Sequence, residues 1–184
     1  MSAEIRYPSV VVAAGVAVGM SLTPGAYVFA TVHRAENREP DAMRAWSSLL
    51  ASVAADRPVV LALHPGTAAA LDGAGIRFTE GVHIIEPQGY RTTLALQLHA
   101  AAILTDSGGV QREAAWLRTP CLILRDRTEW VEAVAESEGH MVIVGLDEAL
   151  ILRELARLAD PREAPALATT RARTLDVRPA GADE

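Results

Sequence analysis

The chain has no lysine, and each of its 17 basic residues is an arginine. The 23 acidic residues outnumber them and give a formal net charge of −6 at pH 7. Binding to the phosphate backbone of a nucleic acid requires a basic stripe, and the sequence contains none. We attribute the uniform use of arginine to a high-GC coding bias. Nucleic acid is therefore excluded as the expected partner.

Cysteine is almost absent as well. The single thiol, Cys121, lies within an apolar run and is expected to be a small buried side chain. The sequence has no second cysteine for a disulfide and no cluster of cysteine and histidine with the spacing of a metal site. A disulfide framework and a structural metal are both excluded.

No apolar run is long enough to cross a membrane. The stretch at residues 10–20 is shorter than the ~20 residues that a transmembrane helix needs. In the residues before it, the positive charge of Arg6 is balanced by Glu4, and Tyr7-Pro8 interrupts the segment. Both features argue against a signal peptide. We expect a buried or partner-facing element in a cytoplasmic protein, with a targeting role as the alternative.

Familiar nucleotide-binding and catalytic signatures are also missing. The sequence contains no P-loop lysine, no GxGxxG and no Ser–His–Asp order. Aromatic residues make up 4% of the chain and apolar residues 50%, so the core is expected to consist mainly of alanine, valine and leucine. With 184 residues the chain can form one well-cored domain and is too short for two ordinary ones.

What the sequence does contain is a regular alternation of apolar runs and amphipathic segments. Strands are expected at residues 27–32, 58–63, 82–85, 102–104, 121–124 and 141–144. Helices are expected at residues 40–55, 67–71, 90–101 and 109–117, from about residue 129, and at residues 147–158. The apolar runs are continuous, which predicts parallel strands covered on both faces. The expected fold class is therefore α/β, with a doubly wound, Rossmann-like parallel sheet.

The chain divides into three expected parts. An apolar lead occupies residues 1–24, the Rossmann-like domain residues 25–160, and an Ala-, Arg- and Pro-rich tail residues 161–184. The tail is expected to fray.

Polar residues follow five of the six expected strands. They lie at residues 33–37, 64–67, 86–90, 106–109 and 125–129. In a parallel sheet these carboxyl ends share one edge, where ligands of such folds bind. The pattern therefore predicts a ligand cleft at that edge.

The fourth of these strand ends indicates a phosphate site. Ser107 is a good N-cap, and Gly108 and Gly109 have no Cβ to keep an anion from their N–H groups. The dipole of the following helix adds about half a positive charge. Glu113, farther along, suits a sugar diol better than a phosphate. Together these residues favour a nucleotide with its diphosphate on the glycines and its ribose on Glu113; an ordinary capped helix is the alternative.

Other strand ends supply further candidates. His33 is favoured as a contact to phosphate or sugar over a core histidine. For His64, a role in loop structure and a role in ligand contact are equally favoured. Gln88 can bind a base edge or form part of a turn. Arg125 suits the mouth of a phosphate site but can also pair with Glu129.

Carboxylates for proton transfer are scarce at this edge. The candidates are Glu36, Glu86 and Asp106, and the sequence indicates a clear partner for none of them.

Together these stretches resemble the C-terminal half of the UDP-N-acetylglucosamine 2-epimerase family, whose two-domain fold is of the GT-B type. The matching stretches are Thr31-Val-His-Arg-Ala-Glu-Asn37, His64-Pro65, Glu86-Pro-Gln-Gly-Tyr90, Thr105-Asp-Ser-Gly-Gly-Val-Gln-Arg-Glu-Ala114 and Arg125-Asp-Arg-Thr-Glu-Trp-Val-Glu132. They follow the family's order, and the resemblance covers about residues 25–145. The Thr-Glu-Trp-Val-Glu version resembles one subgroup.

The resemblance implies an isomerase that inverts C2 of UDP-GlcNAc to give UDP-ManNAc, by elimination of UDP and its re-addition. Hydrolysing relatives release ManNAc, and neither route needs a metal or a nicotinamide cofactor. The implied roles are diphosphate binding by Ser107, Gly108 and Gly109, ribose binding by Glu113, uracil binding by Gln88, and a catalytic position near the diphosphate and sugar for His33. Arg125 is an expected UDP-sugar contact, and Arg34, Glu36, His64 and Glu129 are further candidates.

The sequence departs from the family pattern in two residues. Trp130 stands where many members have a phosphate-binding arginine, so Arg125 or Arg127 is the expected substitute. Thr93 stands where an aromatic residue often packs near the base.

The larger departure is the absence of the family's N-terminal domain, which carries its catalytic carboxylates. We therefore expect the chain to bind UDP weakly and to be nearly inert alone, needing an N-terminal-domain partner chain or assembling as a homo-oligomer. Two alternatives stay open: a non-catalytic UDP-sugar-binding or regulatory module, and the donor-binding half of a GT-B glycosyltransferase.

Overall fold

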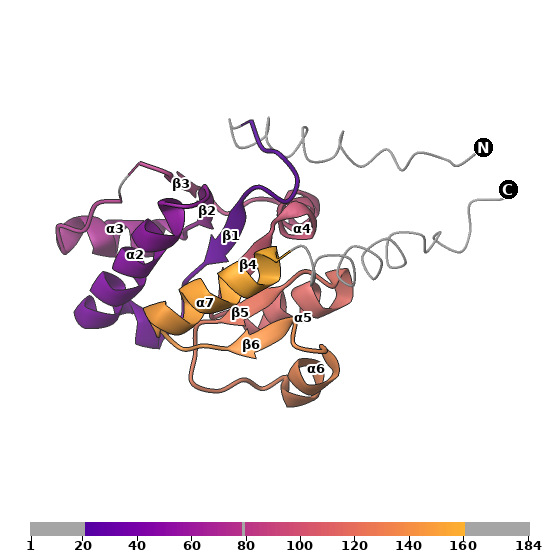
Figure 1. Cartoon of the computed structure of the whole chain (residues 1–184). Coiled ribbons are helices and arrows are strands. Elements are labelled where there is room, and N and C mark those ends of the chain that lie inside the picture. The colour runs from indigo at the N-terminus through magenta and orange to yellow at the C-terminus, as the bar shows by residue number, and fades with distance from the viewer. Residues whose placement is uncertain (1–20, 79, 161–184) are drawn as a thin grey trace, which may run out of the picture.

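Six parallel strands form the centre of the molecule (Figure 1). They are β1 (Val28–Thr31), β2 (Val59–Ala62), β3 (Val82–Ile85), β4 (Ala102–Thr105), β5 (Cys121–Ile123) and β6 (Met141–Ile143). Their order in the sheet is β3-β2-β1-β4-β5-β6. The structure, a computed structural model, describes residues 21–78 and 80–160. The predicted tail, and all of the predicted lead except residues 21–24, lie outside the described residues.

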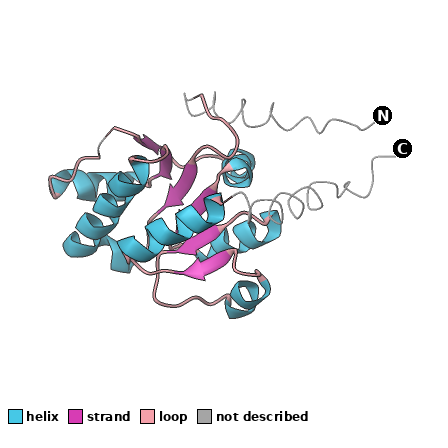
Figure 2. Ribbon diagram, viewed as in Figure 1, coloured by secondary structure: helices cyan, strands magenta, loops and turns pink. Residues whose placement is uncertain are grey.

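Helices cover both faces of the sheet, as a doubly wound fold requires (Figure 2). They are α2 (Pro40–Ala54), α3 (Pro65–Gly73), α4 (Tyr90–His99), α5 (Gly108–Leu117), α6 (Val131–Glu136) and α7 (Glu148–Ala159), and a 3-10 helix, η1 (Ala35–Arg38), follows β1. One apolar cluster contains side chains of α2, α3 and α7, and a second contains those of α4 and α5, with α6 packed against it. Within β1, Val28 and Ala30 belong to the first cluster and Phe29 to the second. The predicted α/β class and doubly wound parallel sheet are confirmed.

Helix α2 shows how the apolar spacing becomes structure. Its buried apolar side chains recur at helical spacing: Met43, Trp46, Leu49, Leu50 and Val53. Burying each large apolar side chain contributes about 1.5–3 kcal/mol. The indole Nε1 of Trp46 also donates a hydrogen bond of 2.9 Å to the carbonyl of Asn37, which fastens α2 to η1.

Burial differs between the middle and the margins of the sheet. Every residue of β1, β4 and β5 is buried, as the continuous apolar runs predict. In the edge strands, however, His83, Ile84 and Ile143 are exposed, because β3 and β6 each have a neighbouring strand on one side alone. Cys121 in β5 is buried, as expected.

The predicted boundaries agree closely with the elements, with three differences. The helix expected at residues 67–71 is longer (α3), α6 begins at Val131 rather than near residue 129, and η1 was not predicted. Within the described range, none of the helices is both long and apolar enough to cross a membrane.

The topology also places the site. From β1 the chain builds the sheet outward through β2 and β3, and then returns to build β4, β5 and β6 on the other side. The gap between the ends of β1 and β4 is therefore the topological switch point, where ligands of open α/β sheets bind.

Candidate nucleotide-binding site

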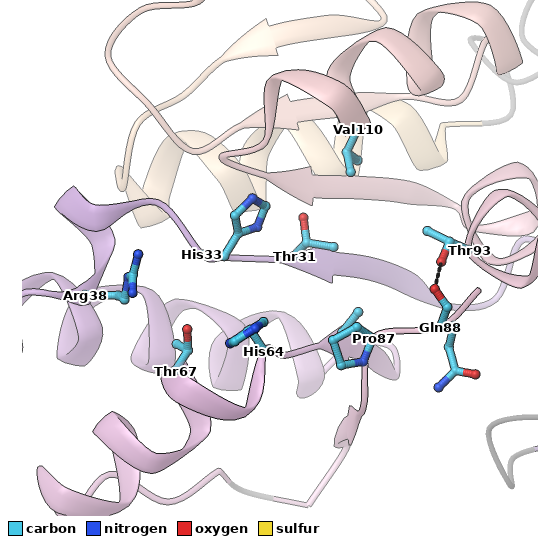
Figure 3. A pocket seen from close by; sticks show the side chains of 10 residues that line it. Thr31, His33, Arg38, His64, Thr67, Pro87, Gln88, Thr93 and Val110 are labelled. Carbon is cyan, nitrogen blue, oxygen red and sulfur yellow. Dashed lines mark hydrogen bonds between the residues drawn. The ribbon is translucent and has the colours of Figure 1, made fainter. Parts of the chain in front are cut away.

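A cavity of about 430 Å³ opens at this edge of the sheet (Figure 3). Its walls include Thr31 and His33 from the end of β1, His64 and Thr67 from the start of α3, and Val110 from the first turn of α5. This volume falls in the range of small-molecule pockets. The cavity lies where the sequence predicts a cleft, and residues of the first three polar strand ends line it. The fourth and fifth strand ends, residues 106–109 and 125–129, lie outside its lining, as does Glu113; from α5, Val110 reaches the cavity.

The carboxylate of Asp106 ties the ends of β1 and β4 together. It is fully buried and accepts hydrogen bonds from the backbone N–H of His33 at 3.0 Å, the backbone N–H of Arg34 at 2.8 Å and the side-chain amide of Asn37 at 2.8 Å. Such donors compensate for the loss of water around an ionised group. The sequence indicates no clear partner for this carboxylate, and the structure corrects that expectation. Two of its partners are backbone N–H groups, which no sequence motif reveals.

Ser107 begins helix α5 as predicted. Its Oγ accepts from the N–H of Val110 at 3.5 Å, and its own N–H donates to Thr105 Oγ1 at 3.0 Å. The hydroxyls of Thr105 and Thr31, which are partners in the β1–β4 register, lie 2.7 Å apart. This hydroxyl chain fixes the start of α5 against the end of β1.

The two glycines at the start of α5 have different surroundings. A Cβ on Gly109 would meet nothing closer than Ser107 Oγ at 3.8 Å. A Cβ on Gly108 would collide with Oε1 of Glu129 and lie 3.2 Å from the indole Nε1 of Trp130. A side chain at position 108 would therefore require the Glu129 carboxylate, which occupies the space next to Gly108, to shift.

Glu129 is the centre of a chain of ion pairs. Its Oε1 lies 3.1 Å from Arg34 Nη2 and its Oε2 lies 2.7 Å from Arg125 Nη1. Arg125 Nε in turn lies 3.2 Å from Glu36 Oε1. The pKa of the Glu129 carboxyl is lowered below its ordinary value by the hydrogen bond from its own backbone N–H and by the two arginines, against partial opposition from desolvation. The carboxylate therefore carries its charge beside the positive end of α5.

Glu113 lies in the second turn of α5. Its Oε2 accepts a hydrogen bond of 2.5 Å from Nε2 of Gln97 on α4. The Gln97 side chain is fully buried, whereas Glu113 is partly exposed. Gln97 is not recognisable as a site residue from the sequence, since a lone glutamine at a helix interface forms no motif.

Gln88 and His64 both form local structure. The amide of Gln88 donates to the carbonyl of Glu86 at 2.8 Å and is turned away from the other lining side chains, while its backbone carbonyl accepts from Thr93 Oγ1 at 3.2 Å (Figure 3). His64 Nδ1 caps α3 by accepting from the N–H of Gly66 at 3.1 Å. His64 also lines the cavity, so loop structure does not exclude ligand contact.

His33 presents its side chain to the cavity. Its Nδ1 lies 3.7 Å from Asp106 Oδ1, and 47% of the side chain is exposed. The carboxylate therefore lies behind the imidazole and leaves it accessible to a ligand. Among the described residues, no group of three or more His, Cys, Asp and Glu side chains is arranged to hold a metal ion.

Trp130 takes part in a stack on the outer side of α5. The Arg112 guanidinium lies 4.7 Å from the Trp130 ring centroid and 5.0 Å from that of Trp116. The Trp130 Nε1 atom is buried and has no hydrogen-bond partner among the described residues. The phosphate-binding arginine expected here in many relatives is thus replaced by a neutral N–H donor close to Gly108.

The sheet order and the position of the cavity define the class of this protein: it is a Rossmann-like α/β domain of the kind that forms one half of a GT-B fold. A profile described as "UDP-N-acetylglucosamine 2-epimerase" matches residues 8–174. The chain belongs to the UDP-N-acetylglucosamine 2-epimerase family.

Individual relatives agree with this placement. The UDP-2,3-diacetamido-2,3-dideoxy-D-glucuronate 2-epimerase of Pseudomonas aeruginosa is 38% identical over 140 residues, which are 73% of this chain and 37% of that protein. The structure of UDP-GlcNAc 2-epimerase from Methanocaldococcus jannaschii superposes with a TM-score of 0.73 at 27% identity, over 86% of this chain and 49% of that chain.

A second structure of the Methanocaldococcus enzyme, in complex with UDP-GlcNAc and UDP, has a TM-score of 0.63 at 32% identity, over 74% of this chain and 39% of that chain. The sequence thus spans less than half the length of these relatives.

Proposed function

We propose that this chain is the UDP-binding half of an enzyme that inverts C2 of a UDP-linked 2-acetamido sugar, with UDP-GlcNAc as the first candidate substrate. One observation carries the proposal: α5 begins with Ser107-Gly108-Gly109 at the switch point of the sheet, beside a cavity of about 430 Å³. A helix N-terminus there offers N–H groups and a positive dipole to an anion.

The site residues divide between the two ends of such a ligand. The diphosphate would lie on the N–H groups of Gly108 and Gly109, next to Ser107, whose own N–H already donates to Thr105 Oγ1. The ribose hydroxyls would donate to Glu113. The uracil would lie near Gln88, meeting its backbone or an amide released from Glu86.

At the other end of the cavity, His33 would face the diphosphate and the reacting sugar. The guanidinium groups of Arg34 and Arg125 lie close enough to Gly108, through Glu129, to add positive charge beside the diphosphate.

The relatives are named for different UDP-linked sugars. The Methanocaldococcus jannaschii relative is named for UDP-GlcNAc, and the Pseudomonas aeruginosa relative for UDP-2,3-diacetamido-2,3-dideoxy-D-glucuronate. These substrates share the UDP group and an acetamido group at C2, where the reaction occurs. We therefore propose that this chain binds the UDP group that these substrates share, and UDP-GlcNAc is the sugar nucleotide to test first.

The cavity has too few acid and base groups for the whole reaction. Inversion at C2 removes a proton from one face and returns a proton to the other, which calls for two positioned groups. None of the described residues that line the cavity is an aspartate or glutamate. We propose that carboxylates come from an N-terminal-domain partner, or from a second copy of this chain, in the cytoplasm.

Complementation tests this function. The chain alone is expected to leave UDP-GlcNAc unchanged. Addition of a separately expressed N-terminal half of an epimerase relative is expected to produce UDP-ManNAc, and NMR detects the product. A non-catalytic module would bind UDP without turnover under either condition. A glycosyltransferase half would instead release UDP only with an acceptor sugar. Conversion by the chain alone, rising steeply with its concentration, would indicate the homo-oligomer.

A further inference from the structure

A fully buried glutamine lies behind the partly exposed Glu113. Gln97 belongs to α4, has no exposed surface, and donates through Nε2 to Glu113 Oε2 at 2.5 Å. Its neighbours Ala95 and Leu96 belong to the apolar cluster on this face of the sheet. A polar side chain among such neighbours stands out, because burying an amide is unfavourable unless its hydrogen bonds are satisfied.

The hydrogen bonds of Gln97 are in fact incomplete. Its Oε1 is buried and has no partner among the described residues. An apolar side chain of similar size at this position would avoid that cost. Among the described residues, the bond to Glu113 is the one hydrogen bond of the Gln97 side chain, so the effect of this side chain must be sought in what that bond does to the carboxylate.

The bond fixes the direction of a flexible side chain. A glutamate carboxylate has two oxygens with about four acceptor sites. When Gln97 holds Oε2, the direction of the carboxylate is set, and Oε1 of the partly exposed Glu113 keeps its acceptor sites for a ligand. A ligand that donates to Glu113 then does not have to immobilise the side chain, which is one of the main costs of binding.

We propose that Gln97 is a positioning residue for Glu113: it orients the carboxylate to accept hydrogen bonds from the ribose diol of UDP. The inference rests on the proposed function and adds to it a residue that does not touch the ligand. The selectivity of the site for a ribose with both hydroxyls would then depend on a side chain buried in α4.

The test compares UDP with 2′,3′-dideoxy-UDP, which lacks the diol, by calorimetric titration of the wild type and the Gln97→Leu variant. Gln97→Leu is expected to weaken UDP binding by about tenfold, equivalent to ~1.4 kcal/mol, while the affinity for 2′,3′-dideoxy-UDP stays the same. A general disturbance of packing would instead weaken both ligands equally, so the ratio of the two affinities separates positioning from structure.

Gln97→Met gives a second, more adaptable apolar side chain, in case leucine does not fold well at this position. The double variant Gln97→Leu/Glu113→Ala should bind UDP no more weakly than Glu113→Ala alone, because the effect of Gln97 passes through Glu113.

An unchanged ratio in both Gln97 variants, with Glu113→Ala still reducing it, would overturn the positioning role and leave the nucleotide site standing. A wild type that binds neither ligand would overturn the proposed function together with this inference.

Discussion

Replacing Glu113 by alanine is expected to weaken UDP binding by about a hundredfold. The carboxylate is expected to accept from both ribose hydroxyls, and a hydrogen bond to a charged group contributes about 1.5–3 kcal/mol. At ~1.4 kcal/mol per factor of ten, losing even the lower value for both bonds gives this factor. Calorimetric titration of the wild type and variant with UDP measures it.

The matched control for this variant is a ligand rather than a second mutation. Pyrophosphate has no ribose, so its affinity for the wild type and for Glu113→Ala should be the same. If both ligands lose affinity in parallel, Glu113 acts on the start of α5 as a whole and not on the ribose. If neither does, the assignment of Glu113 is wrong.

Replacing Glu129 is expected to have the opposite effect and to tighten binding of UDP and pyrophosphate by about tenfold. The Glu129 carboxylate occupies the space beside Gly108 and pairs with Arg34 and Arg125. Glu129→Ala would open this space, remove the carboxylate partner of Arg34 and leave Arg125 paired with Glu36, so that both guanidinium groups gain capacity to bind a phosphate. One order of magnitude corresponds to ~1.4 kcal/mol, a modest value for removing a like charge from an anion site.

The pH and salt dependence of this gain follow from the same charges. Because the pKa of Glu129 is lowered, the wild-type carboxylate stays ionised at mildly acidic pH, and the difference between wild type and variant should persist there. It should shrink at high salt, since screening weakens exposed charges.

Glu132→Ala is the control, because it removes the same charge from an exposed residue of α6. Equal tightening in both variants would mean that net charge alone is responsible. Weaker pyrophosphate binding in Glu129→Ala would show that Glu129 supports the site rather than blocking it.

The sequence predicts the fold well because the apolar runs and helical faces are local patterns. The spacing of Met43, Trp46 and Leu50 sets the face of α2 that is buried, and the six apolar runs become the six strands. The Ser-Gly-Gly motif likewise predicts the N-cap of α5. Such features depend on residues close together in the chain.

The contacts within the site could not be predicted, because they join distant segments. The bonds from His33 and Arg34 to Asp106 use backbone N–H groups, which every sequence has. The Gln97–Glu113 bond depends on the packing of α4 against α5. The sequence does offer the pairing of Arg125 with Glu129 as one alternative, since both residues lie in the segment that follows β5.

The most direct test of the account is an NMR titration of the ¹⁵N-labelled chain with UDP. We expect saturable shifts of backbone amides concentrated at Ser107, Gly108 and Gly109, with further shifts at His33 and Gln88. This result would show that the chain forms its nucleotide site unaided. A folded protein whose spectrum does not change at millimolar UDP would contradict the account, as would shifts confined to the opposite edge of the sheet, around Trp116 and Ser137.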